Sequence, residues 1–172
     1  MKIVIEKDLD VIVRDGTRLA TDIYRPDDGK AYPAIVMRLP YNKELPTLLF
    51  LSGDILRVAQ AGYAVVVQDC RGTFKSDGDF DPFFQEGADG ADTIEWASQQ
   101  SWCNGQVGMM GASYYGATQW LAAVERPPAL KAMAPFITTD QYYDHWTYQG
   151  GAFQLDLFCS GPRRRSPSPT AK

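Results

Sequence analysis

The feature that most constrains this chain is a short apolar strand that runs through a Gly-x-Ser motif directly into a helix. It occupies residues 107–116, with the sequence VGMMGASYYG. A serine at such a sharp strand-to-helix turn needs small neighbours, because the strand and the helix approach each other closely there. Gly111 and Gly116 meet that need. The pattern therefore predicts that Ser113 is exposed as a nucleophile.

The motif departs from the usual Gly-x-Ser-x-Gly pattern, since position 115 is tyrosine and the second glycine is Gly116. An alternative reading is a strand that ends in a glycine turn. Ser113 would then be an ordinary helix N-cap whose side chain accepts an amide of the next turn. The local motif favours neither reading strongly.

Length and composition indicate one globular domain. The chain has 172 residues, of which 45% are hydrophobic and 22% charged. No apolar run reaches the length of a membrane span, and residues 1–8 lack the apolar segment of a secretory signal, so a cytoplasmic location is expected. Cys70, Cys103 and Cys159 are odd in number and lack metal-ligand spacing. We expect buried or inert thiols, and neither a disulfide framework nor a metal site.

Charge is distributed unevenly along the chain. Residues 162–172 hold four of the 17 basic residues and no acid, so the remainder is more acidic than the net charge of −4 indicates. An acidic body argues against a nucleic-acid partner, which needs a basic face. The tail, residues 161–172, is expected to be disordered or foreign to the domain, although it also has the composition of a basic interaction segment.

Hydrophobic periodicity places strands and helices in alternation after an initial hairpin, whose turn is marked by Asp15 and Gly16. The sequence predicts strands at 2–13, 17–24, 33–38, 63–68, 107–110 and 130–135, and helices at 51–61, 87–100 and 114–124. Strands that alternate with helices form parallel sheets covered on both faces. The fold class predicted is α/β, with a mostly parallel, doubly wound sheet and an antiparallel N-terminal hairpin.

With these elements placed, the chain resembles the CocE/NonD family of serine hydrolases, which includes cocaine esterases and X-prolyl dipeptidyl-peptidases. Four segments carry the resemblance, in order: 38–43 (RLPYNK), 69–78 (DCRGTFKSDG), 102–108 (WCNGQVG) and 111–116 (GASYYG). The family's nucleophile motif is Gly-x-Ser-Tyr-x-Gly, which accounts for the departure at position 115. The resemblance covers about residues 5–160 and implies an α/β-hydrolase fold, without a cofactor or metal.

The resemblance also implies roles for individual residues. Ser113 would attack an ester or amide carbonyl and form an acyl-enzyme. The Tyr41 hydroxyl and the backbone N–H of Tyr114 would form the oxyanion hole. Asp69 and Arg71 are expected to be structural, supporting the Tyr41 loop. Trp146 is a candidate wall of the acyl pocket, and a packing role for it is at least as well supported.

The serine also needs a base, and the hydrolase order places an acid and then a histidine after it. The single histidine, His145, comes before any expected position of the acid. We therefore expect a cap or surface role for His145. The nearby acids Asp140 and Asp144 do not make it a better candidate for the catalytic base. The expectation is an N-terminal portion of a hydrolase, truncated after the sixth strand. Its parts would be the hydrolase domain (1–137), the start of a helical cap (138–160) and the tail.

Two functional classes follow. The first is a serine hydrolase of esters or amides, with this chain inactive by itself and prone to self-association through the exposed sheet edge. X-Pro dipeptidyl-peptidase and β-lactam acylase specificities are alternatives within that class. Acylase-like members carry a glutamate where this chain has Tyr115, which favours a plain esterase. The second class is a non-catalytic binding module or a degenerate product.

Overall fold

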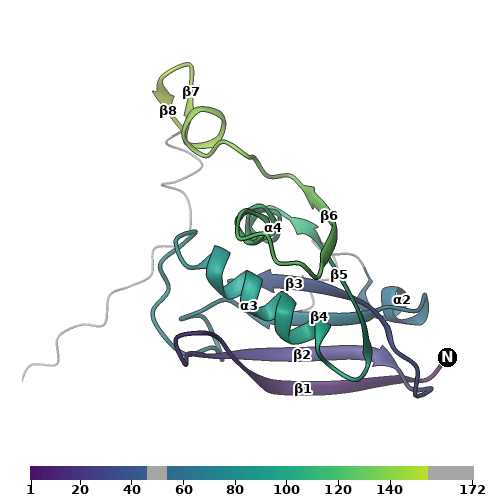
Figure 1. The fold of residues 1–172 in the computed structure, drawn as a ribbon. Helices are drawn as coiled ribbons and strands as arrows, with labels where there is room; N and C mark the ends of the chain where they lie inside the picture. Colours follow the sequence, from purple (N-terminus) through teal and green to yellow (C-terminus); the bar gives the residue numbers. More distant parts are fainter. Residues whose placement is uncertain (46–53, 155–172) are drawn as a thin grey trace, which may run out of the picture. The chain divides into compact units, whose positions relative to one another are not determined.

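The computed structural model describes residues 1–45 and 54–154 of the chain. The chain divides into two compact units, Met1–Thr138 and Thr139–Lys172. The first unit is built on a six-stranded sheet with the strand order β1-β2-β4-β3-β5-β6 (Figure 1).

The observed elements follow the predicted ones closely. The strands are β1 (Ile3–Ile12), β2 (Arg18–Pro26), β3 (Tyr32–Leu39), β4 (Ala64–Asp69), β5 (Cys103–Ala112) and β6 (Leu130–Phe136). The helices of the first unit are α2 (Ile55–Gln60), α3 (Glu86–Ser98) and α4 (Tyr114–Val124). Residues 51–53 of the predicted first helix lie outside the described residues. Strand β5 begins earlier than predicted, at Cys103, which pairs with Tyr32 of β3 ahead of an irregularity in the register.

The N-terminal hairpin forms at the predicted turn. Gly16 has a φ of +86°, which glycine adopts at no steric cost, and the Thr17 N–H donates to the Asp15 carboxylate at 3.0 Å. Strand β1 pairs antiparallel with β2, and β2 pairs antiparallel with β4. The pairs β3–β4, β3–β5 and β5–β6 are parallel. The predicted combination of an antiparallel hairpin and a mostly parallel sheet is confirmed.

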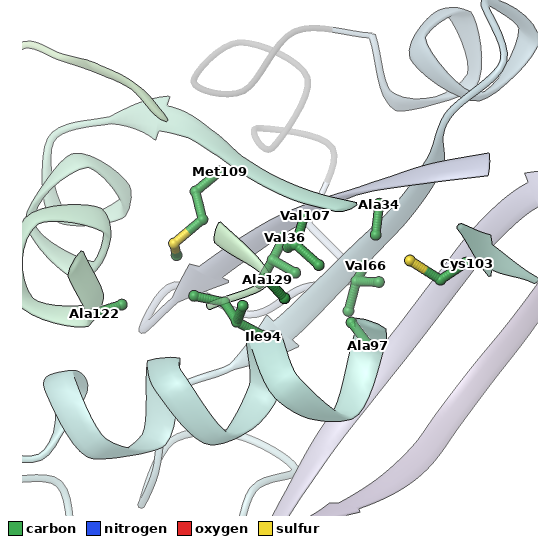
Figure 2. Close-up of a cluster of buried hydrophobic side chains, with 10 residues drawn as sticks. All are labelled: Ala34, Val36, Val66, Ile94, Ala97, Cys103, Val107, Met109, Ala122 and Ala129. Atoms are coloured by element: carbon green, nitrogen blue, oxygen red, sulfur yellow. The ribbon is translucent and has the colours of Figure 1, made fainter. Parts of the chain in front are cut away.

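Both faces of the central strands are covered, which explains their continuous apolar sequences. Side chains alternate between the faces of a strand. On β4, Val66 packs with Ile94 and Ala97 of α3 (Figure 2), whereas Val65 and Val67 belong to a second cluster with α2. Helices α3 and α4 pack against each other over the first face. This double covering holds the carboxyl ends of β3 and β5 rigidly side by side.

The second unit, as far as Gln154, contains a short π-helix, η1 (Tyr143–Thr147), and a small hairpin of β7 (Tyr148–Gln149) and β8 (Ala152–Phe153). The assignment of residues 138–160 to a helical cap stays a prediction. Residues 155–160 and the tail at 161–172 lie outside the described residues. Among the helices of the described part, none has the length and apolar character needed to cross a bilayer.

Candidate active site

Ser113 is the single residue between β5 and α4, and it has φ +55° and ψ −124°. Its carbonyl accepts the N–H groups of Gly116 and Ala117 at 2.9 and 3.1 Å, so the helix begins at once. Its side chain makes no capping hydrogen bond. The N-cap alternative is therefore wrong, and the half-buried hydroxyl is left available at a strained turn.

The two glycines of the motif are required because a Cβ at either position would clash with a neighbouring side chain. An added Cβ at Gly111 would lie 2.5 Å from the Cβ of Tyr115, and Gly111 has a φ of +140°. An added Cβ at Gly116 would lie 2.6 Å from Thr138 Cγ2. Real Cβ atoms do not approach other carbon atoms so closely. The spacing of the motif is therefore set by how tightly β5, α4 and the end of β6 pack around Ser113.

Tyr41 reaches the serine because its loop follows β3, the parallel neighbour of β5. Its ring packs edge-on against Tyr114, with centroids 6.4 Å apart, and lies 5.9 Å from the ring of Tyr115. Burial raises the pKa of the Tyr41 phenol, and the nearby Ser113 side chain partly opposes that rise. The structure thus brings Tyr41 and Ser113 together, although 72 positions separate them in the chain.

Tyr114 directly follows the serine and is held at both ends. As the first residue of α4, it offers a backbone N–H that has no acceptor within the helix. Its hydroxyl donates to Glu86 Oε1 and accepts the Phe83 N–H, both at 3.0 Å, while Phe83 stacks on its ring at 4.9 Å. Burial and the nearby charge of Glu86 raise the pKa of this phenol far above its usual value. Tyr114 therefore stays a neutral hydrogen-bond donor.

Sequence reasoning missed an ion pair that supports the Glu86 partner of Tyr114. The fully buried Arg38, at the end of β3, donates from Nη1 to Glu86 Oε2 at 2.7 Å and from Nε to Gln68 at 2.7 Å. Its Nη2 lies 3.7 Å from Asp89, beyond hydrogen-bonding distance. The signal in the sequence was a single arginine that ends an apolar strand. The pair connects the Tyr41 strand to the helix that anchors Tyr114.

The expected support of the Tyr41 loop by Asp69 is confirmed. Asp69 Oδ1 accepts the backbone N–H of Lys43 at 2.8 Å. Arg71 is structural as expected but acts elsewhere, because it forms ion pairs with Asp89 at 2.6 Å and with Asp15 at 2.7 Å. It therefore ties the β1–β2 turn to α3 and does not support the Tyr41 loop.

Trp146 and His145 both lie in η1, in the second unit. Trp146 is half-buried and packs against Tyr142 with ring centroids 6.3 Å apart, and His145 is exposed. The acyl-pocket assignment of Trp146 and the non-catalytic assignment of His145 stay predictions. Cys70 and Cys103 are free and buried, as expected, and Cys159 lies outside the described residues. Across residues 1–45 and 54–154, no group of His, Cys, Asp and Glu side chains could hold a metal ion.

Comparison with known proteins decides the family. The X-Pro dipeptidyl-peptidase (S15) family matches residues 15–167. The chain belongs to this family. It is 45% identical over 148 residues to the cocaine esterase of Rhodococcus sp. (strain MB1 Bresler), a match that covers 85% of this chain and 26% of that protein. The resemblance to the CocE/NonD group is thereby confirmed.

Solved structures of similar proteins show the same architecture. A CocE/NonD family hydrolase from Staphylococcus aureus superposes with a TM-score of 0.80 at 34% identity, covering 88% of this chain and 30% of that one. An α-amino acid ester hydrolase gives 0.74 at 30% identity, covering 90% and 28%. The α/β-hydrolase fold is confirmed. The chain spans 26% of the length of the curated relatives that it matches.

Proposed function

We propose that this chain carries the nucleophile and oxyanion hole of a serine hydrolase that acts on small esters or amides through an acyl-enzyme. The observation that supports the proposal most is Ser113 itself. Its hydroxyl sits at a left-handed strand-to-helix turn, takes no part in capping and lies beside the Tyr41 side chain. A structural serine would use that hydroxyl to satisfy the helix.

In the proposed reaction, Ser113 Oγ attacks the carbonyl carbon and its proton passes to a general base. The negative charge that develops on the carbonyl oxygen is stabilised by the Tyr41 hydroxyl and the Tyr114 backbone N–H. Donors aimed in this way each contribute about 3 kcal/mol to transition-state stabilisation. Residues 1–138 contain no histidine, so the first unit does not itself supply an imidazole base, and we expect this chain alone to hydrolyse esters near the background rate.

Imidazole offers a direct test, because a small base in solution can replace a missing one. We expect a fluorophosphonate probe to label the native chain slowly, and to label it at least about tenfold faster when imidazole is added. Labelling should disappear in Ser113→Ala and after heat denaturation. Tyr41→Phe should lower the imidazole-stimulated rate by about 100-fold, as expected for the loss of one oxyanion donor.

The outcomes separate the alternatives. Equal labelling of the parent and of Ser113→Ala, with and without imidazole, would refute Ser113 as the nucleophile and favour the non-catalytic class. Fast labelling without imidazole that is lost in His145→Ala would show that this chain supplies its own base, contrary to our expectation.

Within this function we propose plain ester substrates. Tyr115 replaces the glutamate of acylase-like relatives, and its side chain is only 1% exposed and packs into the core beside α2. The position therefore offers no negative charge to an α-amino group. X-Pro dipeptidyl-peptidase and β-lactam acylase specificities are the alternatives, and Trp146 is proposed as a wall of the acyl pocket.

The free thiols of Cys70 and Cys103 support a cytoplasmic location.

Self-association through β6 is a further expectation. Within the described residues, β6 pairs with β5 alone, and Ala132, Ala134 and Phe136 on it are exposed. Unpaired strand edges recruit other chains. Size-exclusion chromatography at increasing concentration should show species larger than a monomer, and Ala132→Lys should reduce them. Ile12→Lys, on the opposite edge strand β1, is the matched control. A concentration-independent monomer would contradict this expectation.

A further inference from the structure

Lys43 lies two residues after Tyr41, and its side chain is completely buried. Lysine is almost never fully buried unless it is paired. The Lys43 ammonium lies 2.8 Å from Asp22 Oδ1 and also forms a short ion pair with Asp8. The Tyr41 loop therefore carries a buried positive charge that is paired with two carboxylates.

The two carboxylates come from separate strands. Asp22 lies on β2 and is fully buried. Asp8 lies at an irregularity of the β1–β2 pairing, with a φ of +54°, and its backbone N–H donates to Asp22 Oδ1 at 2.9 Å. The bulge thus turns the Asp8 carboxylate towards the Lys43 ammonium, which Asp22 also contacts. Bulges commonly re-aim a side chain in this way.

The charge state of Lys43 indicates that its ion pairs with Asp22 and Asp8 fix the position of its ammonium group. Burial acts to lower the pKa of Lys43, but hydrogen bonds to Asp22 and Asp8 outweigh it, so its pKa lies above the usual value and the ammonium stays charged. Hydrogen bonds from Lys43 and Lys75 lower the pKa of Asp8 to about 2. A desolvated charge tolerates little displacement from its partners.

The backbone at Lys43 is also fixed, through its N–H bond to Asp69. Only Asn42, with a φ of +74°, separates this anchored residue from Tyr41. Leu45 N–H donates back to the Asn42 carbonyl at 3.1 Å, which closes the turn. A movement at Lys43 therefore passes directly to the Tyr41 ring.

We propose that Lys43 is a positioning residue, whose ion pairs with the buried Asp22 and the partly exposed Asp8 hold the Tyr41 side chain beside Ser113. The N-terminal hairpin thereby becomes part of the support of the oxyanion hole. This inference rests on the proposed role of Tyr41, although its test requires no hydrolysis and no general base.

The test measures the contact between Tyr41 and Ser113 by NMR of the chain labelled with ¹³C at the tyrosine Cζ. Tyr41→Phe assigns the Tyr41 resonance among the nine tyrosines. In the parent chain, Ser113→Ala removes the hydroxyl beside the Tyr41 side chain and should shift this resonance. In a Lys43→Met background, we expect the same substitution to produce less than about half of that shift, since coupled residues deviate from additivity.

Two further variants keep the test decisive. Lys75→Met is the matched control: Lys75 pairs with Asp8 at 2.7 Å and with Glu44, and its side chain is 44% exposed. It should leave the Ser113→Ala shift unchanged. Asp8→Asn removes one partner of Lys43, and asparagine tolerates the positive φ. It should fold even if Lys43→Met does not, and should reduce the shift partly.

Each result has a distinct meaning. A full Ser113→Ala shift in Asp8→Asn and in folded Lys43→Met would overturn the positioning role and leave the proposed function intact. No shift in the parent chain would overturn both the inference and the place of Tyr41 in the oxyanion hole. If Lys75→Met reduced the Ser113→Ala shift as much as Lys43→Met does, the positioning role of Lys43 would also be refuted, because the effect would then be general to this charge network.

Discussion

Replacing Gly111 with alanine is expected to lower the free energy of unfolding by about 3–5 kcal/mol and to abolish fluorophosphonate labelling of Ser113. Two costs add at this position. A φ of +140° is disfavoured for any residue with a Cβ, and the new methyl group would lie 2.5 Å from the Cβ of Tyr115. Relief would require α4 to move away from β5, and Ser113 would move with it.

Gly105→Ala is the matched control for this prediction. Gly105 lies on the same strand and also has a positive φ, +86°, but an added Cβ there would meet nothing within 4 Å. It should cost only about 1–2 kcal/mol, the cost of a left-handed conformation, and should leave labelling unchanged. Urea denaturation followed by circular dichroism measures both. Equal losses in the two variants would show that the contact with Tyr115 does not restrict the turn.

Arg38→Met is expected to lower the free energy of unfolding by about 3–5 kcal/mol. Arg38 is fully buried and its ion pair with Glu86 is almost entirely desolvated, with side-chain exposures of 0% and 3%. Removing the guanidinium leaves the Glu86 carboxylate buried, with the Tyr114 hydroxyl as its remaining side-chain donor among the described hydrogen bonds. Tyr114 should lose part of its anchor, so labelling of Ser113 should also slow.

A double variant isolates the contribution of the Arg38–Glu86 ion pair to stability. Arg38→Met with Glu86→Gln removes both charges and keeps an oxygen that can accept the Tyr114 hydroxyl, so it should be more stable than Arg38→Met alone. Arg14→Met breaks the exposed ion pair to Asp92 on the same helix, α3, and should cost at most about 1 kcal/mol. If Arg38→Met were as mild as Arg14→Met, the buried pair would not stabilise the fold.

Local patterns explain why much of the fold could be predicted. The apolar run of β4 reflects a strand covered on both faces. Gly16 marks a turn through its positive φ, and Asp15 marks it through a side chain that accepts the Thr17 N–H. The nucleophile turn was also predictable, because the close approach of β5 and α4 excludes a Cβ at Gly111 and Gly116. Each of these signals lies within a few residues of the structure it specifies.

The charged groups under the site could not be predicted in the same way. Arg38 meets Glu86, which is 48 positions away, and Lys43 meets Asp8, 35 positions away. Nothing in the local sequence distinguishes these residues from exposed charges, since burial and pairing arise only when the strands assemble. Tyr41 was found because its motif resembles that of a known family, not because of its spacing.

The place of β3 in the sheet has a consequence for how the chain folds. Strand β3 lies between β4 and β5, and both of these neighbours follow it in the sequence. During synthesis, the strand that leads to Tyr41 leaves the ribosome with neither edge paired, and it must wait for residue 112 before both ladders are complete. Such non-local pairing is slow. We therefore expect Tyr41 and Ser113 to meet late in folding, after a period in which the edges of β3 can pair with other chains.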